Sequence, residues 1–185
     1  MALLGSFISL SLDGCYADAN SDMSWAHTQD PEQAEFTASN AKGGGGLVFG
    51  RTTYEMMASF WPTPAAAQMM PDVAAQMNAL PKTVFSRTLK SADWNNTRVV
   101  NADLAGELRR LKSGKGPDLT ILGSGTIVAQ AASAGLLDEL QVMLVPVALG
   151  AGKRLFDGVP RGIAWRREEV RQFSNGNVFI RYRPA

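Results

Sequence analysis

The chain has 185 residues, 45% of them hydrophobic, which is enough to bury one core, so we expect a single domain over residues 1–185. Eighteen Lys and Arg against seventeen Asp and Glu leave a net charge of +1 with no block of like charge, which argues against nucleic-acid binding. No apolar run approaches the roughly 18 residues that cross a bilayer, and the first residues lack a basic leader, so we expect a soluble, cytoplasmic protein without membrane contact.

The first expected element is a strand, because apolar and polar side chains alternate over residues 7–12 and the run ends at Asp13. Residues 15–29 are polar and irregular, and they predict a loop over one edge of the core. Asp30 and Pro31 are residue types that favour a helix N-cap and the first helical position. A helix is therefore expected to begin at Pro31.

The next part of the chain alternates between strands and helices. Four glycines at 43–46 end the first helix, because each costs about 1 kcal/mol inside a helix, and residues 47–49 form a short buried strand. Gly50 then leads into a helix over residues 51–60. The stretch 61–81 is bracketed by prolines and rich in Ala and Met, which predicts one further helix lying over the sheet.

The second half begins with the same alternation and ends differently. Strands are expected at 82–86, 97–100 and 118–122, with a helix at 102–112. This order predicts an α/β sheet with parallel crossovers. Three strand-like runs follow, at 137–149, 164–173 and 177–183. The last two runs are joined by "SNGN", a hairpin signal, so we expect a mixed sheet with an antiparallel C-terminal edge.

Three segments that follow strands could bind an anion, because ligands of open α/β sheets lie at the carboxyl ends of strands. We call them the first, second and third corners. The first corner, at 50–53, places the guanidinium of Arg51 and the hydroxyls of Thr52 and Thr53 together in the first turn of a helix. The alternative is that one threonine only caps the helix. The second corner, at 86–88, offers Ser86 and Arg87, a plausible pair for a 2′-phosphate, although a solvated strand end has the same composition.

The third corner is "GSGT" at 123–126, where glycines allow close approach of a pyrophosphate and Thr126 opens a helix. It is not a Rossmann fingerprint, because Val128 stands where the third glycine is expected, and a plain helix-start turn is the alternative. The segment "GAGKR" at 150–154 is not a nucleotide loop, because no Ser or Thr follows Lys153.

Taken together, these motifs resemble the dihydrofolate reductase-like reductases, and most closely the branch with the C-terminal reductase domain of the riboflavin-pathway deaminase-reductase. The motifs that carry the resemblance, which spans residues 3–183, are "SLDG", "FGRTTYEMM", "VFSRTL", "LGSG", "GLLDEL" and "PVALGAGKRLF". The resemblance implies a mixed sheet of about eight strands flanked by helices, with NADPH across the carboxyl ends of the strands. It also implies a homodimer, for which the C-terminal strands are a plausible interface.

Carried over by position, the resemblance assigns the cofactor site to the three corners and the first strand. The first corner (Gly50, Arg51, Thr52, Thr53) would bind cofactor phosphates, Ser86 and Arg87 the 2′-phosphate, and Gly123, Ser124, Gly125 and Thr126 the pyrophosphate and ribose. Ser9 and the backbone near Ala17 would flank the nicotinamide. The sequence does not determine whether the Gly123–Ser124 peptide bond is cis.

The acceptor side is less defined by sequence. Dihydrofolate reductase uses one helix carboxylate, and the resemblance places Glu32 in this catalytic role, with Asp30 and Glu35 as alternatives and Glu35 also as a pocket residue. A solvated first-turn acid is the alternative for each. Aromatic side chains that could wall a flat heterocycle, or simply pack in the core, are Tyr16, Trp25 and Trp61. No Cys and His spacing indicates a metal site.

Two functions follow from this pattern. The first is an NADPH-dependent reductase that transfers a hydride to a small pterin-like or pyrimidine-like heterocycle or to another conjugated acceptor. The second is an NADP(H)-binding protein without turnover, acting as a sensor or interaction module, because the catalytic carboxylate is uncertain. The two differ in one measurement, since a binder saturates with NADPH and oxidises none of it.

Overall fold

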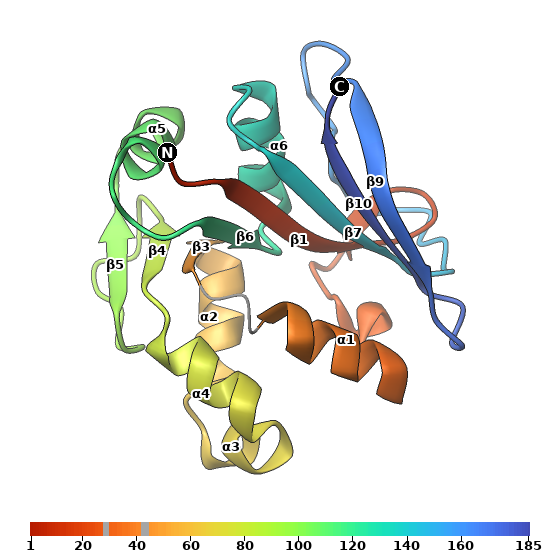
Figure 1. The fold of residues 1–185 in the computed structure, drawn as a ribbon, viewed down its shortest axis with the longest axis horizontal. Coiled ribbons are helices and arrows are strands. Elements are labelled where there is room, and N and C mark those ends of the chain that lie inside the picture. The colour runs from red at the N-terminus through yellow and green to blue at the C-terminus, as the bar shows by residue number, and fades with distance from the viewer. Residues whose placement is uncertain (28–29, 42–44) are drawn as a thin grey trace.

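The computed structural model describes residues 1–27, 30–41 and 45–185, and in these ranges the chain forms one eight-stranded sheet in the order β5-β4-β3-β6-β1-β7-β10-β9 (Figure 1). Its strands are β1 (Leu4–Leu10), β3 (Gly46–Gly50), β4 (Lys82–Phe85), β5 (Thr97–Val100), β6 (Leu119–Leu122), β7 (Glu139–Leu144), β9 (Trp165–Gln172) and β10 (Val178–Pro184). The first six strands of this order are parallel to one another. Strand β10 pairs antiparallel with both β7 and β9, which gives the antiparallel C-terminal edge that the sequence predicted.

Helices cover both faces of the sheet. They are α1 (Pro31–Ala41), α2 (Arg51–Phe60), α3 (Pro64–Met69), α4 (Pro71–Ala79), α5 (Leu104–Ser113) and α6 (Gly125–Ser133), with a short 3-10 helix η1 (Ser24–Ala26). Leu108 of α5 and Val128 of α6 are fully buried in one core cluster with Ile8 and Ile121 of the sheet. On the other face, α2 and α4 enclose a second cluster around Phe49, and α1 contributes to a third (Figure 1). Both faces of the parallel part of the sheet are therefore covered, as a parallel sheet requires.

The start of α1 is as predicted. The carboxylate of Asp30 accepts a hydrogen bond from Gln33 N at 2.8 Å, which is the N-cap interaction. Asp30 also accepts bonds from Ser174 Oγ at 2.7 Å and Asn175 N at 3.2 Å, so it fixes the β9–β10 hairpin against α1. Only part of the predicted glycine stop at 43–46 can be compared, because residues 42–44 lie outside the described ranges.

The prediction of one helix over residues 61–81 is wrong. Two helices occur there, because Pro71 has no N–H for a helix that arrives from α3 and instead begins α4. Thr63 caps α3 by accepting a hydrogen bond from Ala66 N at 3.3 Å. Helix α4 packs Met77 into the core, whereas α3 projects away from the sheet (Figure 1).

The loop predicted for residues 15–29 is also partly wrong. Residues Cys15–Asp18 form a strand, β2, which pairs antiparallel with β8 (Gly152–Arg154) in a separate two-stranded ribbon. The side chains of Cys15 and Ala17 are buried, 0% and 4% exposed. No local pattern reveals this ribbon, because each strand is short and its partner lies about 135 residues away in the sequence.

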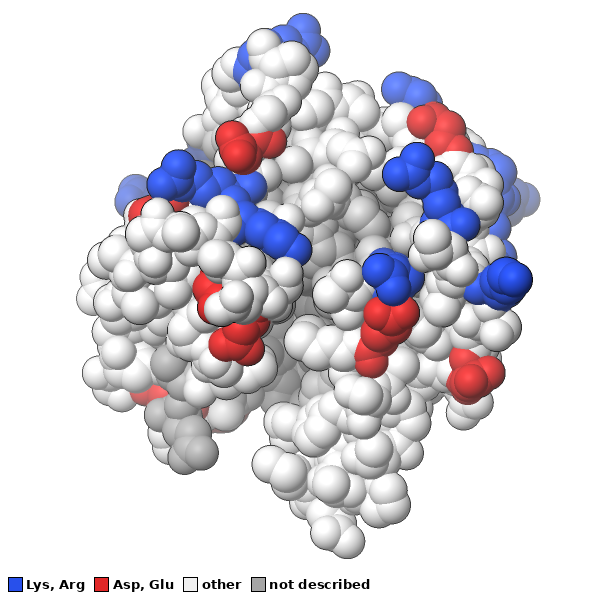
Figure 2. All heavy atoms as spheres, turned by 180° about the vertical axis from the view of Figure 1, so that it is seen from behind, with Lys and Arg blue, Asp and Glu red and all other residues white. Residues whose placement is uncertain are grey.

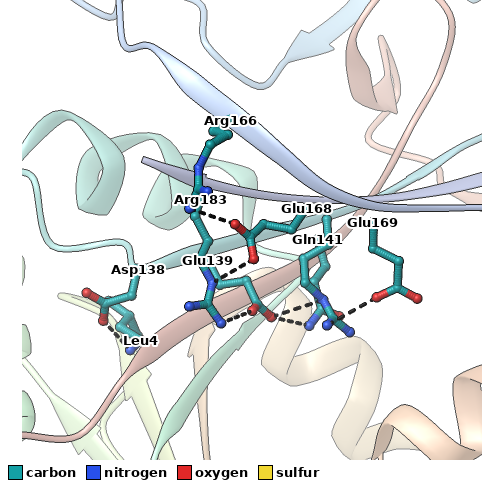
Figure 3. A network of polar contacts seen from close by, with 9 residues as sticks. Leu4, Asp138, Glu139, Gln141, Arg166, Glu168, Glu169 and Arg183 are labelled. Atoms are coloured by element: carbon teal, nitrogen blue, oxygen red, sulfur yellow. Dashed lines mark hydrogen bonds and ion pairs between the residues drawn. The ribbon is translucent and has the colours of Figure 1, made fainter. Parts of the chain in front are cut away.

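The antiparallel edge of the sheet has a charged face (Figure 3). Arg183 of β10 lies 3.5 Å from Glu139 of β7 and 3.8 Å from Glu168 of β9, and Arg181 lies 3.1 Å from Glu169. These partly exposed pairs contribute little stability each, but they keep an edge of the sheet polar. The homodimer implied for these strands stays a prediction.

The turn after β1 depends on Asp13. Its carboxylate accepts hydrogen bonds from Ser11 Oγ at 2.6 Å, Leu149 N at 3.1 Å and Gly150 N at 2.8 Å, which join β1 to the segment before β8. The bond from the Ser11 hydroxyl, followed by that from Leu149 N, lowers the pKa of Asp13 from 3.8 to about 2. The ionised carboxylate therefore holds the base of the β2–β8 ribbon.

Because the folded pKa of Asp13 is depressed, its contribution to stability is complete above pH 3.8 and is lost as pH falls toward 2. We predict that Asp13→Asn unfolds at lower urea concentration near neutral pH and loses less further stability between about pH 4 and pH 2 than the wild type. Urea midpoints across this range test it, with the exposed Asp93→Asn as control. Parallel loss of stability in the Asp13 variant and the wild type would contradict the prediction.

Candidate functional site

The three corners meet in one cleft of about 600 Å³, which we call the main cleft. They do so because β3, β4 and β6 are adjacent parallel strands whose carboxyl ends reach the same edge of the sheet. Its lining includes residues 50–53 of the first corner, 86–87 of the second and 123–126 of the third. On the side of the molecule hidden in Figure 1, a hollow runs between two lobes with Lys and Arg on both flanks (Figure 2).

At the first corner, helix α2 begins without a side-chain cap. Its N-cap is Gly50, and neither Thr52 nor Thr53 caps the helix, so the capping alternative does not hold. Uncapped first-turn N–H groups are donors for an anion, and the helix dipole adds positive potential. Arg51 is exposed, and its guanidinium lies 3.4 Å from Glu55 one turn later.

At the third corner, the backbone takes two consecutive left-handed residues, Gly123 (φ +59°) and Ser124 (φ +52°). The peptide bond between them is trans. Ser124 Oγ accepts a hydrogen bond from Gly50 N at 3.0 Å and donates to Leu122 O at 3.2 Å, which joins this corner to the first. Like α2, helix α6 has no side-chain cap, so two helix N-termini open toward the same space.

Tyr16 of β2 lies on the first residue of α6. A Cβ atom at Gly125 would stand 2.7 Å from Cγ of Tyr16 and closer still to Cδ1 and Cε1. Gly125 is therefore needed here for the tyrosine ring, in addition to any approach of a phosphate. The sequence placed Tyr16 in an acceptor wall, whereas the structure places it at the third corner, with Oη 3.3 Å from Thr126 Oγ1.

At the second corner, Ser86 closes its own turn. Its Oγ accepts hydrogen bonds from Thr88 N at 3.2 Å and Leu89 N at 2.9 Å, and it lies 3.5 Å from Thr88 Oγ1, where either hydroxyl could donate. Arg87 is exposed and lines the main cleft. Both residues expected to bind a 2′-phosphate thus lie on the same wall.

Positive charge exceeds negative charge around the main cleft. Among the described residues, Arg51, Arg87 and Lys153 line it, together with the carboxylate of Asp103. Lys153 comes from β8, and its Nζ donates to Ser21 Oγ at 2.7 Å. An anionic ligand is favoured by this balance.

Several expected residues lie elsewhere. Glu32 is exposed in the first turn of α1 and pairs with Arg171 of β9 at 3.0 Å, so its position outside the main cleft argues against the expected catalytic role. The alternative Asp30 serves as the N-cap of α1, and Glu35 is exposed on that helix. Ala17 lines the cleft, whereas Ser9 is not among its lining residues.

The side chains of Trp25 and Trp61 do not line the main cleft. Trp61 packs between α2 and α4, with Nε1 donating to Met57 Sδ at 3.1 Å. Trp25 lies in η1 and donates to Asp22 O at 3.2 Å. Tertiary packing therefore uses Trp61, a local turn uses Trp25, and the aromatic wall that the sequence suggested does not form at this cleft.

Sequence reasoning missed a fourth segment of the lining, residues 100–104 between β5 and α5. The rule that located the three corners could have found it, because this segment also follows a parallel strand. Lys153 and Met23 were missed for another reason. They reach the cleft only through the β2–β8 ribbon and the loop beside it, which carry no local signal.

We predict that Gly125→Ala destabilises the protein by about 1–3 kcal/mol, because the new methyl group overlaps the Tyr16 ring. In a Tyr16→Ala background, the same substitution should cost much less, so the two changes should couple in a double-mutant cycle measured by urea unfolding. Gly116→Ala, where a Cβ meets open space, is the control. Additive effects of the two changes would contradict the prediction.

Comparison with known proteins gives a consistent result. The family model of the RibD C-terminal domain matches residues 3–179. The uncharacterized protein YyaP of Bacillus subtilis (strain 168) is 27% identical over 175 residues, which cover 95% of this chain and 91% of YyaP.

Two solved structures show the same fold. A putative riboflavin biosynthesis protein from Shewanella sp. PV-4 superposes with a TM-score of 0.77 at 22% identity, covering 100% of this chain and 99% of that one. A diaminohydroxyphosphoribosylaminopyrimidine deaminase/5-amino-6-(5-phosphoribosylamino)uracil reductase from Thermotoga maritima gives 0.69 at 14% identity, covering 100% and 57%. The chain therefore has the dihydrofolate reductase-like fold and belongs to the RibD C-terminal domain family.

Proposed function

We propose that this protein is an NADPH-dependent reductase that transfers a hydride to a small heterocyclic acceptor of the pterin or pyrimidine type, or to a related conjugated acceptor. The observation that carries the proposal is the meeting of three anion-binding corners in one cleft. A dinucleotide with a 2′-phosphate has three phosphate groups to place, and the volume of about 600 Å³ lies in the range of ligand pockets.

The donor set fits this cofactor. The uncapped N-termini of α2 and α6 supply backbone N–H groups for the pyrophosphate, and Thr53 and Thr126 add hydroxyls beside them. Ser86 and Arg87 would hold the 2′-phosphate through a hydroxyl that exchanges its long contact with Thr88 for the phosphate, and through a guanidinium. The buried Ala17 would lie beside the nicotinamide.

The cofactor would supply the hydride, and the protein would orient the cofactor and the acceptor and exclude water from between them. Ile8, Ala17 and Met23 add apolar side chains to the lining of the main cleft. An acceptor with a flat conjugated ring suits such a surface. The similar protein from Thermotoga maritima is named as a reductase of a uracil derivative, which supports a pyrimidine as the first acceptor to test.

A second candidate is a protein that binds NADP(H) without turnover. The position of Glu32 favours it, because that carboxylate is paired with Arg171 and lies outside the main cleft. Asp103, the carboxylate in the described lining, accepts a hydrogen bond from Gly106 N at 2.7 Å as the N-cap of α5. A helix cap is a structural role, so a proton donor for the acceptor is not evident among these acids.

We predict that the protein binds NADPH more tightly than NADH and that Arg87→Ala removes most of this preference. Loss of a charge-assisted hydrogen bond should weaken NADPH by about tenfold to a hundredfold and leave NADH unchanged. Quenching of tryptophan fluorescence during titration measures both constants. Arg109→Ala, on the exposed surface of α5, is the matched control. Equal affinity of the wild type for the two cofactors would contradict the assignment of the second corner.

Turnover separates the two candidates. We expect NADPH oxidation, followed at the nicotinamide absorbance, with at least one pterin, pyrimidine or flavin precursor, and we expect Glu32→Gln to leave its rate unchanged because Glu32 lies outside the cleft. Saturable NADPH binding without oxidation by any acceptor would instead favour the binding protein. A large loss of rate in Glu32→Gln would restore the role that the resemblance gave to this residue.

A further inference from the structure

Tyr16 has a place at the third corner that the family resemblance did not assign. It belongs to β2, whose ribbon with β8 is separate from the main sheet. Its ring lies against Gly125, the first residue of α6, where the backbone N–H groups of the helix begin. The aromatic ring therefore lies beside the N-terminus of α6.

The hydroxyl of Tyr16 has a partner that a phosphate could replace. Tyr16 Oη lies 3.3 Å from Thr126 Oγ1, which is long for a bond between two hydroxyls, whose usual distance is about 2.7–2.8 Å. Hydrogen bonds to an ionised phosphate oxygen are shorter and about twice as strong as neutral ones. Both hydroxyls could therefore turn to an anion at the helix N-terminus with a gain in free energy.

Tyr16 also lines two cavities. A second cavity of about 700 Å³ lies along the flank of α6, and Tyr16 lines both it and the main cleft. Residues of β8 and the segment after it, 152–160, contribute much of the wall of this second cavity. Thr126 of the third corner lines both cavities as well, so both hydroxyls lie where a ligand in the main cleft can reach them.

We propose that Tyr16 is a pyrophosphate-binding residue of this protein. Its hydroxyl donates to a pyrophosphate oxygen at the N-terminus of α6, and Thr126 donates beside it. This proposal rests on the proposed NADPH site. It makes Tyr16 a determinant of selectivity for a dinucleotide over a nucleotide that carries the 2′-phosphate alone.

The test uses Tyr16→Phe, which keeps the ring on Gly125 and removes the hydroxyl. Binding of NADP⁺ and of 2′-AMP to the full chain is measured by calorimetry, because 2′-AMP has the phosphate of the second corner and no pyrophosphate. We expect Tyr16→Phe to weaken NADP⁺ about tenfold and to leave 2′-AMP unchanged. Arg87→Ala should weaken both ligands.

Tyr182→Phe removes the same hydroxyl from β10, away from the lining of both cavities, and is the matched control. Wild-type affinity of Tyr16→Phe for NADP⁺ would overturn the role of Tyr16 while the NADPH site stands. Equal weakening of NADP⁺ and 2′-AMP would also overturn it, because it would indicate a general effect on the cleft. A wild type that binds neither ligand would instead overturn the NADPH site itself, and the inference with it.

Discussion

One serine hydroxyl holds the two helix N-termini of the site together. Gly50 N donates to Ser124 Oγ at 3.0 Å, and Ser124 Oγ donates to Leu122 O at 3.2 Å. The contact exists because β3 and β6 are parallel neighbours, so that both chains leave the sheet at the same edge. The Ser124 hydroxyl thus gives an acceptor to the backbone N–H of Gly50, the N-cap residue of α2, which has no side chain to cap the helix. The donors of α2 and α6 are thereby fixed toward one space.

This constraint explains which part of the site the sequence could predict. Gly50 is the last residue of a short strand, and Ser86 and Gly123 each directly follow one. Because carboxyl ends of parallel strands meet at one edge of a sheet, such positions can be placed together without any knowledge of distance. The eight-stranded mixed sheet and its C-terminal hairpin followed from similar local patterns. The function of each small residue did not, because Gly125 is constrained by the ring of Tyr16, which arrives from a ribbon formed by distant segments.

Lys82 shows the same limit in the core. At the start of β4 it has the composition of a solvated strand end, yet it is only 2% exposed. Its Nζ donates to Leu80 O at 2.7 Å, Asn95 O at 3.0 Å and Asn78 O at 3.3 Å, and it lies 4.4 Å from the ring of Trp94. Burial lowers the pKa of Lys82 to about 8. Three backbone carbonyls, two from the C-terminal end of α4 and one from the loop before β5, compensate this charge, and a sequence gives no sign of where carbonyls converge.

The acceptor side of the cleft resists prediction for a related reason. Phosphates are recognised by helix N-termini, hydroxyls and guanidinium groups, which sequence patterns mark, whereas a flat ring is recognised by whichever apolar surface remains free after packing. Trp25 and Trp61 each donate their indole N–H within the chain, and Trp61 packs in the core. In the proposed reductase, the surface left for an acceptor would include Ala17 of the β2–β8 ribbon and Met23 in the loop beside it. The choice of acceptor would therefore depend on this ribbon, the element whose pairing the sequence does not show.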